Sequence, residues 1–502
     1  MPAKQAYDYI IVGGGTAGSV VAARLAENPG ITVCLLEAGP TDFDNPQILD
    51  VKNWPSLLGT PLDYDYTIEE QERGNSLIRH SRARVLGGCS SHNSCIAFRA
   101  PQYDMDSWQQ LGCDGWGARE TKPYFDKVFE RVYIEKNPPI HPLSQAFLEA
   151  AQQAGFALTA FNTDDELREG VGIFQLNMRD SLRQSSSQAY LHPILKTAPN
   201  LDVLTNTVAH KILLDEYHTA YAVTADTTTI RAKREIVLCC GTFNTPKLLL
   251  LSGLGPQQHL SELGIPSKVA LAGVGEHLID HPEGVIIWET NQPVSDQTTQ
   301  YWEVGLFSKV FPGAPVPDLM FHFGLVPFDW NTVPAGYPTA QYGFSITPNV
   351  TRAKSEGRVR LRSCDPQDAP LLDFRYFTDP EGYDETILVE GIKLARKIAA
   401  RPALKTWIKR ELAPGIHMQS EQELSDYARR TANTVYHPAG TCRMGRRDHP
   451  LTVVDAQLRV KSTHRLRIAD ASIFPTMTSV NPCMTCMMIG EKCADLLIHA
   501  EE

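Results

Sequence analysis

The sequence of 502 residues lacks a long hydrophobic run. No uninterrupted apolar stretch reaches the roughly 18 to 20 residues that a membrane-spanning helix needs, so no such span is expected. The first residues, MPAKQAYDY, leave no room for a signal peptide before the first apolar stretch, and the last, HAEE, do not match a peroxisomal tripeptide. These absences predict a cytoplasmic protein.

The chain also has fewer positively charged residues than negatively charged ones. The chain has 47 Lys and Arg residues against 58 Asp and Glu residues, which gives a net charge of −11. This acidic balance argues against binding to nucleic acid or to an anionic membrane surface. With 42% hydrophobic and 21% charged residues, and with neither internal repeats nor low-complexity segments, the composition is that of a globular enzyme with two domains or one large one.

A framework of disulfides or zinc is not indicated. The eleven cysteines are an odd number, are scattered through apparent strands and helices, and are therefore expected to be reduced. The CxxC motif at Cys483 and Cys486 has no second pair at zinc spacing and no thioredoxin-like context. We interpret it as packing at the start of a helix, and we predict no metal site.

The sequence does contain a β-α-β pattern near its start. An apolar run at Tyr9–Val12 leads into Gly13-Gly14-Gly15-Thr16-Ala17-Gly18, then into a helical stretch and a second apolar run that ends at Glu37. In this fingerprint the first glycine permits a tight turn, the second lets the backbone approach a pyrophosphate, and the third lets the helix pack on the strand. The phosphates would lie at the helix N-terminus, and Glu37 would accept from ribose hydroxyls. The pattern predicts a dinucleotide and leaves FAD and NAD equally open.

Later segments predict the rest of this domain and a second sheet. Residues 235–240 resemble a buried parallel strand, and residues 201–231 alternate like an antiparallel hairpin or meander. Residues 281–375 are richer in aromatic residues and proline, and their strand-like pieces at 284–289, 319–323 and 357–362 predict a separate antiparallel sheet. We expect helices at 143–154, 383–399 and 485–500, and a strand entering a turn at 466–472.

Several motifs together resemble one known family. They are the opening fingerprint, RVLGGCSS at 84–91, GTFNTP at 241–246, and the ending with Asp470, Asn481 and Pro482. In this combination and order the chain is similar, nearly from end to end, to the glucose-methanol-choline family of flavin oxidoreductases. The stretches GGCSSHNSCIAF, GVGEHLIDHPEG, ITPNV, DFRYFTDPEG and NTVYHPAGT are similar to its choline-oxidising members.

The resemblance implies an α/β, Rossmann-like FAD-binding domain, an α+β substrate domain built on a six-stranded antiparallel sheet, and a homodimer. The expected FAD domain comprises residues 1–155, 172–280 and 432–502, and the substrate domain comprises residues 156–171 and 281–431. His92 stands where members of the family attach the flavin covalently through its 8α-methyl group, which would raise its reduction potential. The residues expected to bind FAD are Gly13, Gly15, Thr16, Ala17, Gly18, Glu37, Arg84, Gly87, Gly88, His92, Asn93, Asp470, Asn481 and Pro482.

The same resemblance assigns the chemistry to four residues. His437 and Asn481 match the pair over the reactive face of the flavin, where an imidazole stabilises the alkoxide and an amide donates without titrating. His322 matches a second histidine that helps position the substrate hydroxyl, and Ser94 matches a serine that points toward flavin N5. Which group takes the hydroxyl proton stays open.

Substrate recognition is expected to depend on a carboxylate and aromatic rings. A quaternary ammonium has no N–H to donate, so a carboxylate and aromatic faces are what can hold it. The matching residues are Glu283 for the carboxylate, Trp54, Trp302 and Tyr436 for the aromatic box, Phe328 for a gate, and Val435 for the small apolar side chain that leaves oxygen room to react.

The implied reaction is the oxidation of choline through betaine aldehyde to glycine betaine, with FAD as the cofactor and O2 reduced to H2O2. Three alternatives stay open: the same oxidation with another electron acceptor, an oxidase of a neutral primary alcohol, and a flavoprotein that binds without catalysis. A buried, unpaired Glu283 argues against the neutral alcohol because such a carboxylate is costly. Tyr301, where a second tryptophan is expected, and Cys442, Cys483 and Cys486 depart from the family pattern.

Overall fold

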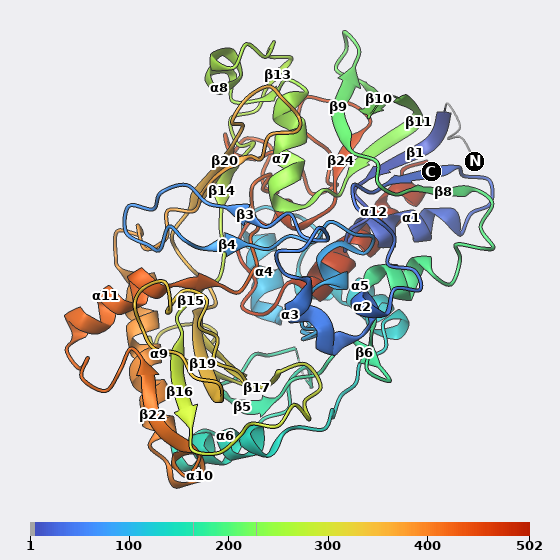
Figure 1. Cartoon of the computed structure of the whole chain (residues 1–502). Coiled ribbons are helices and arrows are strands. Elements are labelled where there is room, and N and C mark those ends of the chain that lie inside the picture. Colours follow the sequence, from blue (N-terminus) through green and yellow to red (C-terminus); the bar gives the residue numbers. More distant parts are fainter. Residues whose placement is uncertain (1–5, 164, 227, 502) are drawn as a thin grey trace.

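Two large sheets with separate hydrophobic cores organise the chain, as a computed structural model shows for residues 6–163, 165–226 and 228–501. The first sheet lies at the upper right of Figure 1 and the second at the lower left. None of the helices in these described ranges has the length and apolar character of a membrane span.

The first sheet contains the β-α-β unit that the sequence predicts. Its order is β8-β2-β1-β11-β10-β9, and β24 also pairs with β11. β11 is long enough for both partners: its first residues pair antiparallel with β10 and its last ones parallel with β24. The strands are β1 (Ala6–Val12), β2 (Val33–Leu36), β8 (Leu201–Leu204), β9 (Ala209–Leu214), β10 (Ala220–Ala225), β11 (Thr228–Leu238) and β24 (Leu466–Ile468).

The prediction of one antiparallel hairpin or meander over residues 201–231 is wrong for its first strand. β8 pairs parallel with β2, with Val33 opposite Leu201, and the antiparallel strands begin only at β9. The four residues of β8 are all half-buried because the strand lies at the edge of the sheet. They therefore lack the fully apolar character by which a central parallel strand is recognised.

The second sheet is antiparallel, as predicted, and its main path has six strands in the order β22-β16-β19-β18-β17-β5. Two short strands extend it, since β15 pairs with β19 and with β23. Residues 357–360 (β20) do not join it, because they pair with β14 and β21 in a smaller sheet. The strands are β5 (Gly170–Ile173), β15 (Pro282–Glu283), β16 (Ile286–Thr290), β17 (Trp302–Ser308), β18 (Leu319–Gly324), β19 (Gly343–Val350), β22 (Ile408–Ala413) and β23 (Asn433–Thr434), with β14 (Glu276–Leu278), β20 (Gly357–Arg360) and β21 (Leu371–Asp373) in the smaller sheet.

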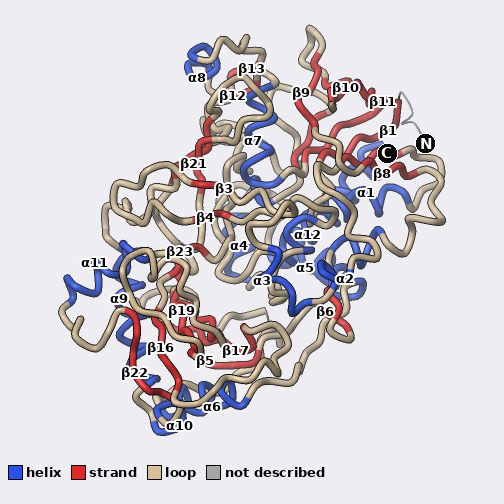
Figure 2. The backbone as a smooth tube through the Cα atoms, viewed as in Figure 1, coloured by secondary structure: helices blue, strands red, loops and turns tan. Residues whose placement is uncertain are grey.

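The three predicted helices are confirmed as α6 (Pro142–Gln153), α9 (Tyr383–Ala399) and α12 (Cys483–Ile498). α6 and α9 pack on the second sheet, while α12 packs between α1 (Gly18–Ala26) and α5 (Ala118–Arg131) near the first sheet (Figure 2). The other helices are α2 (Pro46–Leu49), α3 (Trp54–Leu57), α4 (Gln102–Gln110), α7 (Gly241–Leu251), α8 (Gln257–Glu262), α10 (Pro402–Lys405) and α11 (Glu421–Thr431), and the remaining strands are β3 (Tyr66–Thr67), β4 (Arg79–His80), β6 (Met178–Arg179), β7 (Leu182–Arg183), β12 (Leu254–Gly255) and β13 (Val269–Ala270).

Two elements cross the expected domain boundaries, which themselves stay a prediction. α6 lies within the first expected FAD segment, but its Leu143 and Phe147 belong to the core of the second sheet. β23 lies within the last expected FAD segment and pairs with β15 of the second sheet. The second crossing brings chain segments from both expected domains together beside Glu283.

Candidate active site

A cavity of about 730 Å³ is lined by residues from both halves of the molecule. Its lining includes every residue that the sequence singles out for cofactor, substrate or chemistry, except Gly18 and Gly87. These two glycines shape the loops behind it: a Cβ on Gly18 would lie 1.9 Å from the Gly13 carbonyl oxygen, and one on Gly87 would lie 2.1 Å from Ser91 Oγ. The volume is that of a site for a small molecule or cofactor.

The fingerprint forms a surface on which a flat dinucleotide fits. Gly13 has φ +101°, and a Cβ there would lie 2.4 Å from the Cys239 carbonyl oxygen. A Cβ on Gly15 would meet no protein atom closer than 3.7 Å, so the glycine leaves room on the cavity side. Gly88 backs directly onto Gly15, since its Cβ would lie 2.7 Å from the Gly15 Cα. The two glycine loops are therefore in contact, as a shared binding surface for FAD requires.

Glu37 lies in the cavity at the end of β2, as predicted. Its Oε2 accepts from the Gly14 N–H at 3.0 Å, and its Oε1 accepts from the Gly39 N–H at 2.8 Å. Burial nevertheless raises the pKa of this carboxyl to about 7. Each oxygen keeps a second lone pair, which suits it to accept from ribose hydroxyls.

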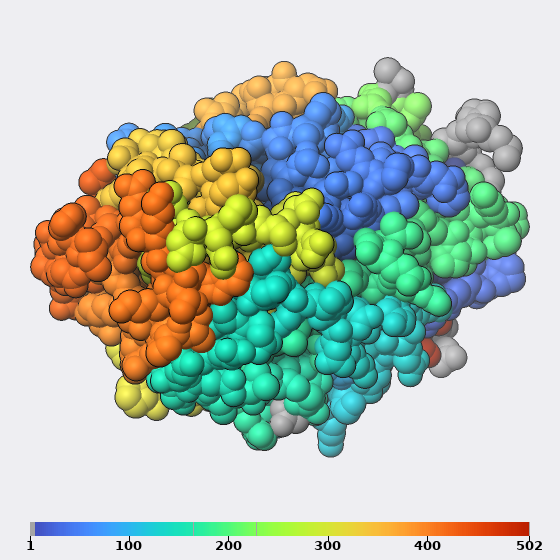
Figure 3. Space-filling model, turned by 60° about the horizontal axis from the view of Figure 1, so that its bottom comes forward, coloured from blue at the N-terminus to red at the C-terminus, as the bar shows by residue number. Residues whose placement is uncertain are grey.

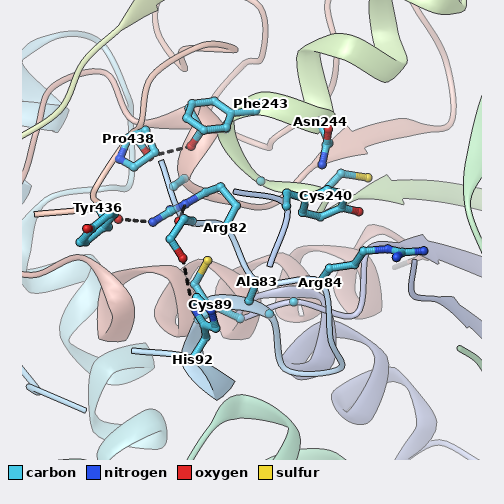
Figure 4. A pocket seen from close by; sticks show the side chains of 18 of the residues that line it. Arg82, Ala83, Arg84, Cys89, His92, Cys240, Phe243, Asn244, Tyr436 and Pro438 are labelled. Carbon is cyan, nitrogen blue, oxygen red and sulfur yellow. Dashed lines mark hydrogen bonds between the residues drawn. The ribbon is translucent and has the colours of Figure 1, made fainter. Parts of the chain in front are cut away.

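His92 follows the short 3₁₀ turn Gly88–Ser91 and is 5% exposed. Its Nδ1 lies 3.5 Å from Ser81 Oγ, the contact drawn in the lower part of Figure 4. Its Nε2 is buried without a hydrogen-bond partner in the described part of the chain, and the carboxylate oxygen Oδ2 of Asp63 is 4.0 Å away. Burial lowers the His92 pKa to about 4, so the ring is neutral at pH 7. A neutral nitrogen without a protein partner fits a group that is bonded to the cofactor.

Arg183 holds the chain around this turn in place, and sequence reasoning missed it. The side chain is fully buried, its Nε donates to the Ile48 carbonyl, and its Nη1 donates to the carbonyls of Ser90 and Asn93 at 3.2 and 2.7 Å. Nη1 also donates to Asn93 Oδ1 at 3.0 Å. No carboxylate forms an ion pair with Arg183 among the described residues, so its charge lies buried behind the segment that carries His92.

His281, a second residue that the sequence analysis did not single out, orients the ring of His437. His281 Nε2 lies 2.9 Å from two carbonyl oxygens, those of Thr351 and Thr478, so this nitrogen carries the proton. Burial lowers the His281 pKa to about 4, and the neutral ring therefore presents a lone pair at Nδ1. That Nδ1 is 2.9 Å from His437 Nδ1, which must donate. The hydrogen-bond pattern leaves His437 Nε2 as an acceptor.

The environment of His437 keeps it neutral. Burial, together with the nearby His281, His322 and Arg82, lowers the His437 pKa well below its ordinary value. Its backbone N–H donates to Asp280 Oδ1 at 3.1 Å, and the other oxygen of Asp280 accepts from Thr434 and Tyr376. An imidazole held in this way is ready to accept a proton at pH 7.

His322, on β18, complements this acceptor. Asn349 Nδ2 donates to His322 Nδ1 at 3.3 Å, so the proton of the neutral ring lies on Nε2. Burial lowers the His322 pKa to about 3, and Asn481 lies beside the ring. Asn481 Oδ1 is buried and makes no hydrogen bond of ordinary geometry to the protein atoms described. Of the two histidines expected to act on the substrate, His437 thus presents an accepting nitrogen and His322 a donating one.

Glu283, on β15, is 4% exposed and also lines this cavity. Asn433 Nδ2 donates to its Oε2 at 3.3 Å, and in the described ranges no Lys, Arg or His side chain forms an ion pair with it. Burial raises its pKa to about 8. Trp54 and Trp302 line the same cavity with ring centroids 6.2 Å apart, and Phe328 lies 5.6 Å from Trp302. The cavity thus contains both a buried carboxyl and aromatic faces, the groups that can hold a quaternary ammonium.

The remaining predicted residues also lie along the lining. Asp470 Oδ2 accepts from the Gly241 N–H and from Thr245 Oγ1. Arg82, which the sequence analysis did not single out, lies at the centre of Figure 4 and donates to the Tyr436 carbonyl. Others that line the cavity are Thr16, Ala17, Arg84, Asn93, Ser94, Val435, Tyr436 and Pro482.

The residues that depart from the family pattern lie at different depths. Cys483 and Cys486 line the cavity, and burial raises the pKa of both thiols, so they are protonated at pH 7. Cys442 is buried in the first core, and Tyr301 is absent from the lining. The departures therefore leave the groups around Glu283 and His437 unchanged.

Comparisons with known proteins agree with this geometry. The family profiles of GMC oxidoreductase match residues 7–283 and 353–490. Choline oxidase of Arthrobacter globiformis is 48% identical over 98% of this chain and 94% of its own length. Mitochondrial choline dehydrogenase of Mus musculus is 33% identical over 98% of this chain and 90% of its own. The crystal structure of pyridoxine 4-oxidase from Mesorbium loti superposes with a TM-score of 0.90 at 29% identity, covering 99% of each chain. The chain therefore belongs to the GMC oxidoreductase family of FAD-dependent enzymes.

Proposed function

We propose that the chain is an FAD-dependent choline oxidase that converts choline through betaine aldehyde to glycine betaine and reduces O2 to H2O2. The observation that carries the proposal is Glu283, a buried carboxylate without a cationic partner among the described residues, in the same cavity as His437. With a neutral alcohol this buried carboxyl stays protonated at pH 7, whereas a quaternary ammonium compensates the charge of its ionised form. The 48% identity to a choline oxidase over nearly the whole chain supports the same substrate.

The side chains suit the oxidation of a primary alcohol. The ammonium group would lie against Glu283, Trp54 and Trp302, which orients the hydroxyl toward the two histidines. His322 Nε2 donates to the substrate oxygen, and His437 Nε2 accepts the hydroxyl proton. The resulting imidazolium stabilises the alkoxide electrostatically. FAD bound along the fingerprint would supply the acceptor for the hydride that leaves the alcohol's α-carbon, and would pass that electron pair on to O2.

The electron acceptor separates the proposal from its nearest alternative. A choline dehydrogenase relative is 33% identical, so the substrate could stay the same while the acceptor changes. We expect the purified holoenzyme to take up O2 and to form one H2O2 per oxidation step with choline and with betaine aldehyde, and to turn over benzyl alcohol poorly. An oxygen electrode with a peroxidase-coupled assay measures both. Reduction of a dye by choline without O2 uptake would support a dehydrogenase instead.

Covalent attachment of FAD to His92 is the second part of the proposal. The buried His92 Nε2 without a hydrogen-bond partner in the described chain supports it. We expect acid-precipitated protein to retain its yellow colour, and a His92→Asn variant to release the flavin into the supernatant. As a control, His417→Asn changes an exposed histidine outside the cavity and should keep the colour in the pellet. Complete release from the unchanged protein would contradict attachment.

Two further parts rest on the resemblance and on composition. A homodimer is proposed from the family resemblance, and size-exclusion chromatography with light scattering tests it. A reducing, cytoplasmic location is proposed because all eleven cysteines, each within the described ranges, are free thiols.

A further inference from the structure

Four aromatic rings form a row from the cavity to the protein surface. The ring centroids of Trp54 and Trp302 are 6.2 Å apart, those of Trp302 and Phe328 are 5.6 Å apart, and those of Phe328 and Trp330 are 5.2 Å apart. The first three rings line the cavity and are 7–9% exposed. Trp330 does not belong to the lining and is 48% exposed. The row therefore ends at the solvent-exposed Trp330, and the buried Phe328 lies between Trp330 and Trp302 of the proposed ammonium site.

The loop that carries Trp330 is held on both sides of this residue. The Phe328 N–H donates to Ser345 Oγ on β19 at 2.8 Å. Asn331 Nδ2 donates to the Ala432 carbonyl at 3.1 Å and to Asn433 Oδ1 at 3.0 Å. Asn433 is the residue whose amide donates to Glu283. The hydrogen bonds thus hold the chain on both sides of Trp330 against β19 and against the residue that contacts Glu283.

The surroundings of the loop suit a cation. In Figure 3, yellow atoms of the segments around residues 290–340 lie at the surface between the blue N-terminal part of the chain and the orange part. Asp329 is half-buried next to Trp330 in sequence, and its Oδ2 accepts from the Thr339 hydroxyl. Arg430, a positively charged residue, donates from its Nη2 to the Ala335 carbonyl of the same loop. Tryptophan is the best aromatic partner for a cation, with about 0.5–1 kcal/mol at an exposed position.

We propose that Trp330, the exposed end of the aromatic row, is an outer binding site for quaternary ammonium cations, distinct from the inner site of Glu283, Trp54 and Trp302. The inference rests on the proposed function, because it gives the outer site the same class of ligand as the inner one. Choline contacts the outer site first and reaches the inner one by passing Phe328. A cation too bulky to pass Phe328 binds at the outer site alone.

The test uses binding to the holoenzyme, so it does not depend on turnover. Isothermal titration calorimetry with tetrabutylammonium, a bulky probe, measures the outer site, and the tighter step of a tetramethylammonium titration measures the inner site, where a carboxylate adds to the aromatic faces. We expect Trp330→Leu to weaken tetrabutylammonium about two- to fivefold, which corresponds to the cation–π range. Trp330→Phe should keep most of the affinity, because it keeps an aromatic face. Tetramethylammonium affinity should stay unchanged in both variants, and Tyr217→Leu, which removes a 73% exposed ring elsewhere, should change neither.

Two outcomes would overturn the outer site. Equal tetrabutylammonium affinity in Trp330→Leu and the unchanged protein would show that the indole binds no cation. Equal weakening in the Leu and Phe variants would show that the loss of indole packing, not of an aromatic face, is responsible. Failure of the proposed function would give a different result, namely that the unchanged holoenzyme takes up no O2 with choline.

Discussion

Replacing Glu283 with glutamine should lower kcat/KM for choline by about 30-fold to a few thousand-fold, since removing one partner of a buried charge pair costs about 2–5 kcal/mol. The glutamine keeps the size of the side chain and its contact with Asn433, so the fold should survive. The neutral isostere 3,3-dimethylbutan-1-ol has a carbon in place of the ammonium nitrogen and should lose little. Steady-state oxygen consumption with both substrates measures the difference.

The choice between the two substrates makes this test specific. A variant that merely disturbs the cavity would slow both alcohols by the same factor. Equal losses for choline and for 3,3-dimethylbutan-1-ol would therefore exclude the role of Glu283 in binding the cation. Glu289→Gln is a matched control, because Glu289 lies on the second sheet and pairs with Lys409 and Arg410 outside the cavity.

The raised pKa of Glu283 predicts that kcat/KM for choline depends on pH. Burial raises the Glu283 pKa to about 8 in the free protein, so the carboxyl is mostly protonated below that pH. Choline binds the ionised form, and kcat/KM for choline should therefore fall about tenfold for each pH unit below about 8. This decrease in kcat/KM at low pH should be absent when the neutral isostere is the substrate, and absent for choline in the Glu283→Gln variant. His437 does not account for it, because its pKa is lowered and its charge changes only at more acidic pH.

Replacing His437 with glutamine should reduce the rate of flavin reduction by choline by roughly 100- to 10,000-fold, the usual contribution of a general base. Glutamine can still donate to His281 Nδ1 but cannot take a proton at the position of His437 Nε2. The measurement is anaerobic stopped-flow reduction at saturating choline, which separates the chemical step from binding. His417→Gln, an exposed histidine outside the cavity, serves as the control.

Binding should respond differently from chemistry in the His437 variant. Because Glu283 and the tryptophans hold the ammonium group, the affinity for tetramethylammonium should change little. A His437→Gln enzyme that reduces its flavin at the normal rate would exclude His437 as the proton acceptor and direct attention to His322, which also lines the cavity.

Local patterns allowed much of this architecture to be predicted. The fingerprint, the apolar strand after Glu235 and the periodicity of α6, α9 and α12 are properties of short segments, and the structure contains each of them. The resemblance to one family supplied the residues around the cavity. β8 was misjudged because an edge strand does not show the apolar run of a central one.

The supporting residues could not be predicted in the same way. The contact between His281 and His437 joins positions 156 residues apart, and those between Arg183 and Asn93 join positions 90 apart. Such pairs depend on how β15 and β23 align and on how the turn before His92 folds, which no local pattern encodes. A signal did exist, since His281 stands two positions before the predicted carboxylate and shares its motif.

The pairing of β15 with β23 fixes the spacing between Glu283 and the segment that leads to His437. Glu283 lies opposite Asn433, and the Val435 N–H donates to the His281 carbonyl, so both strands stay paired up to the residue before Tyr436. The proposed cation partner, Glu283, and the proposed proton acceptor, His437, are therefore held at a fixed spacing by the paired strands. An alcohol with its hydroxyl one methylene farther from the ammonium would present the wrong atom to His437, and misplacement of about 1 Å is enough to cost a large factor in rate. Under the proposed roles, we therefore expect the pairing of these two strands to contribute to discrimination by chain length, along with the side chains that contact the substrate.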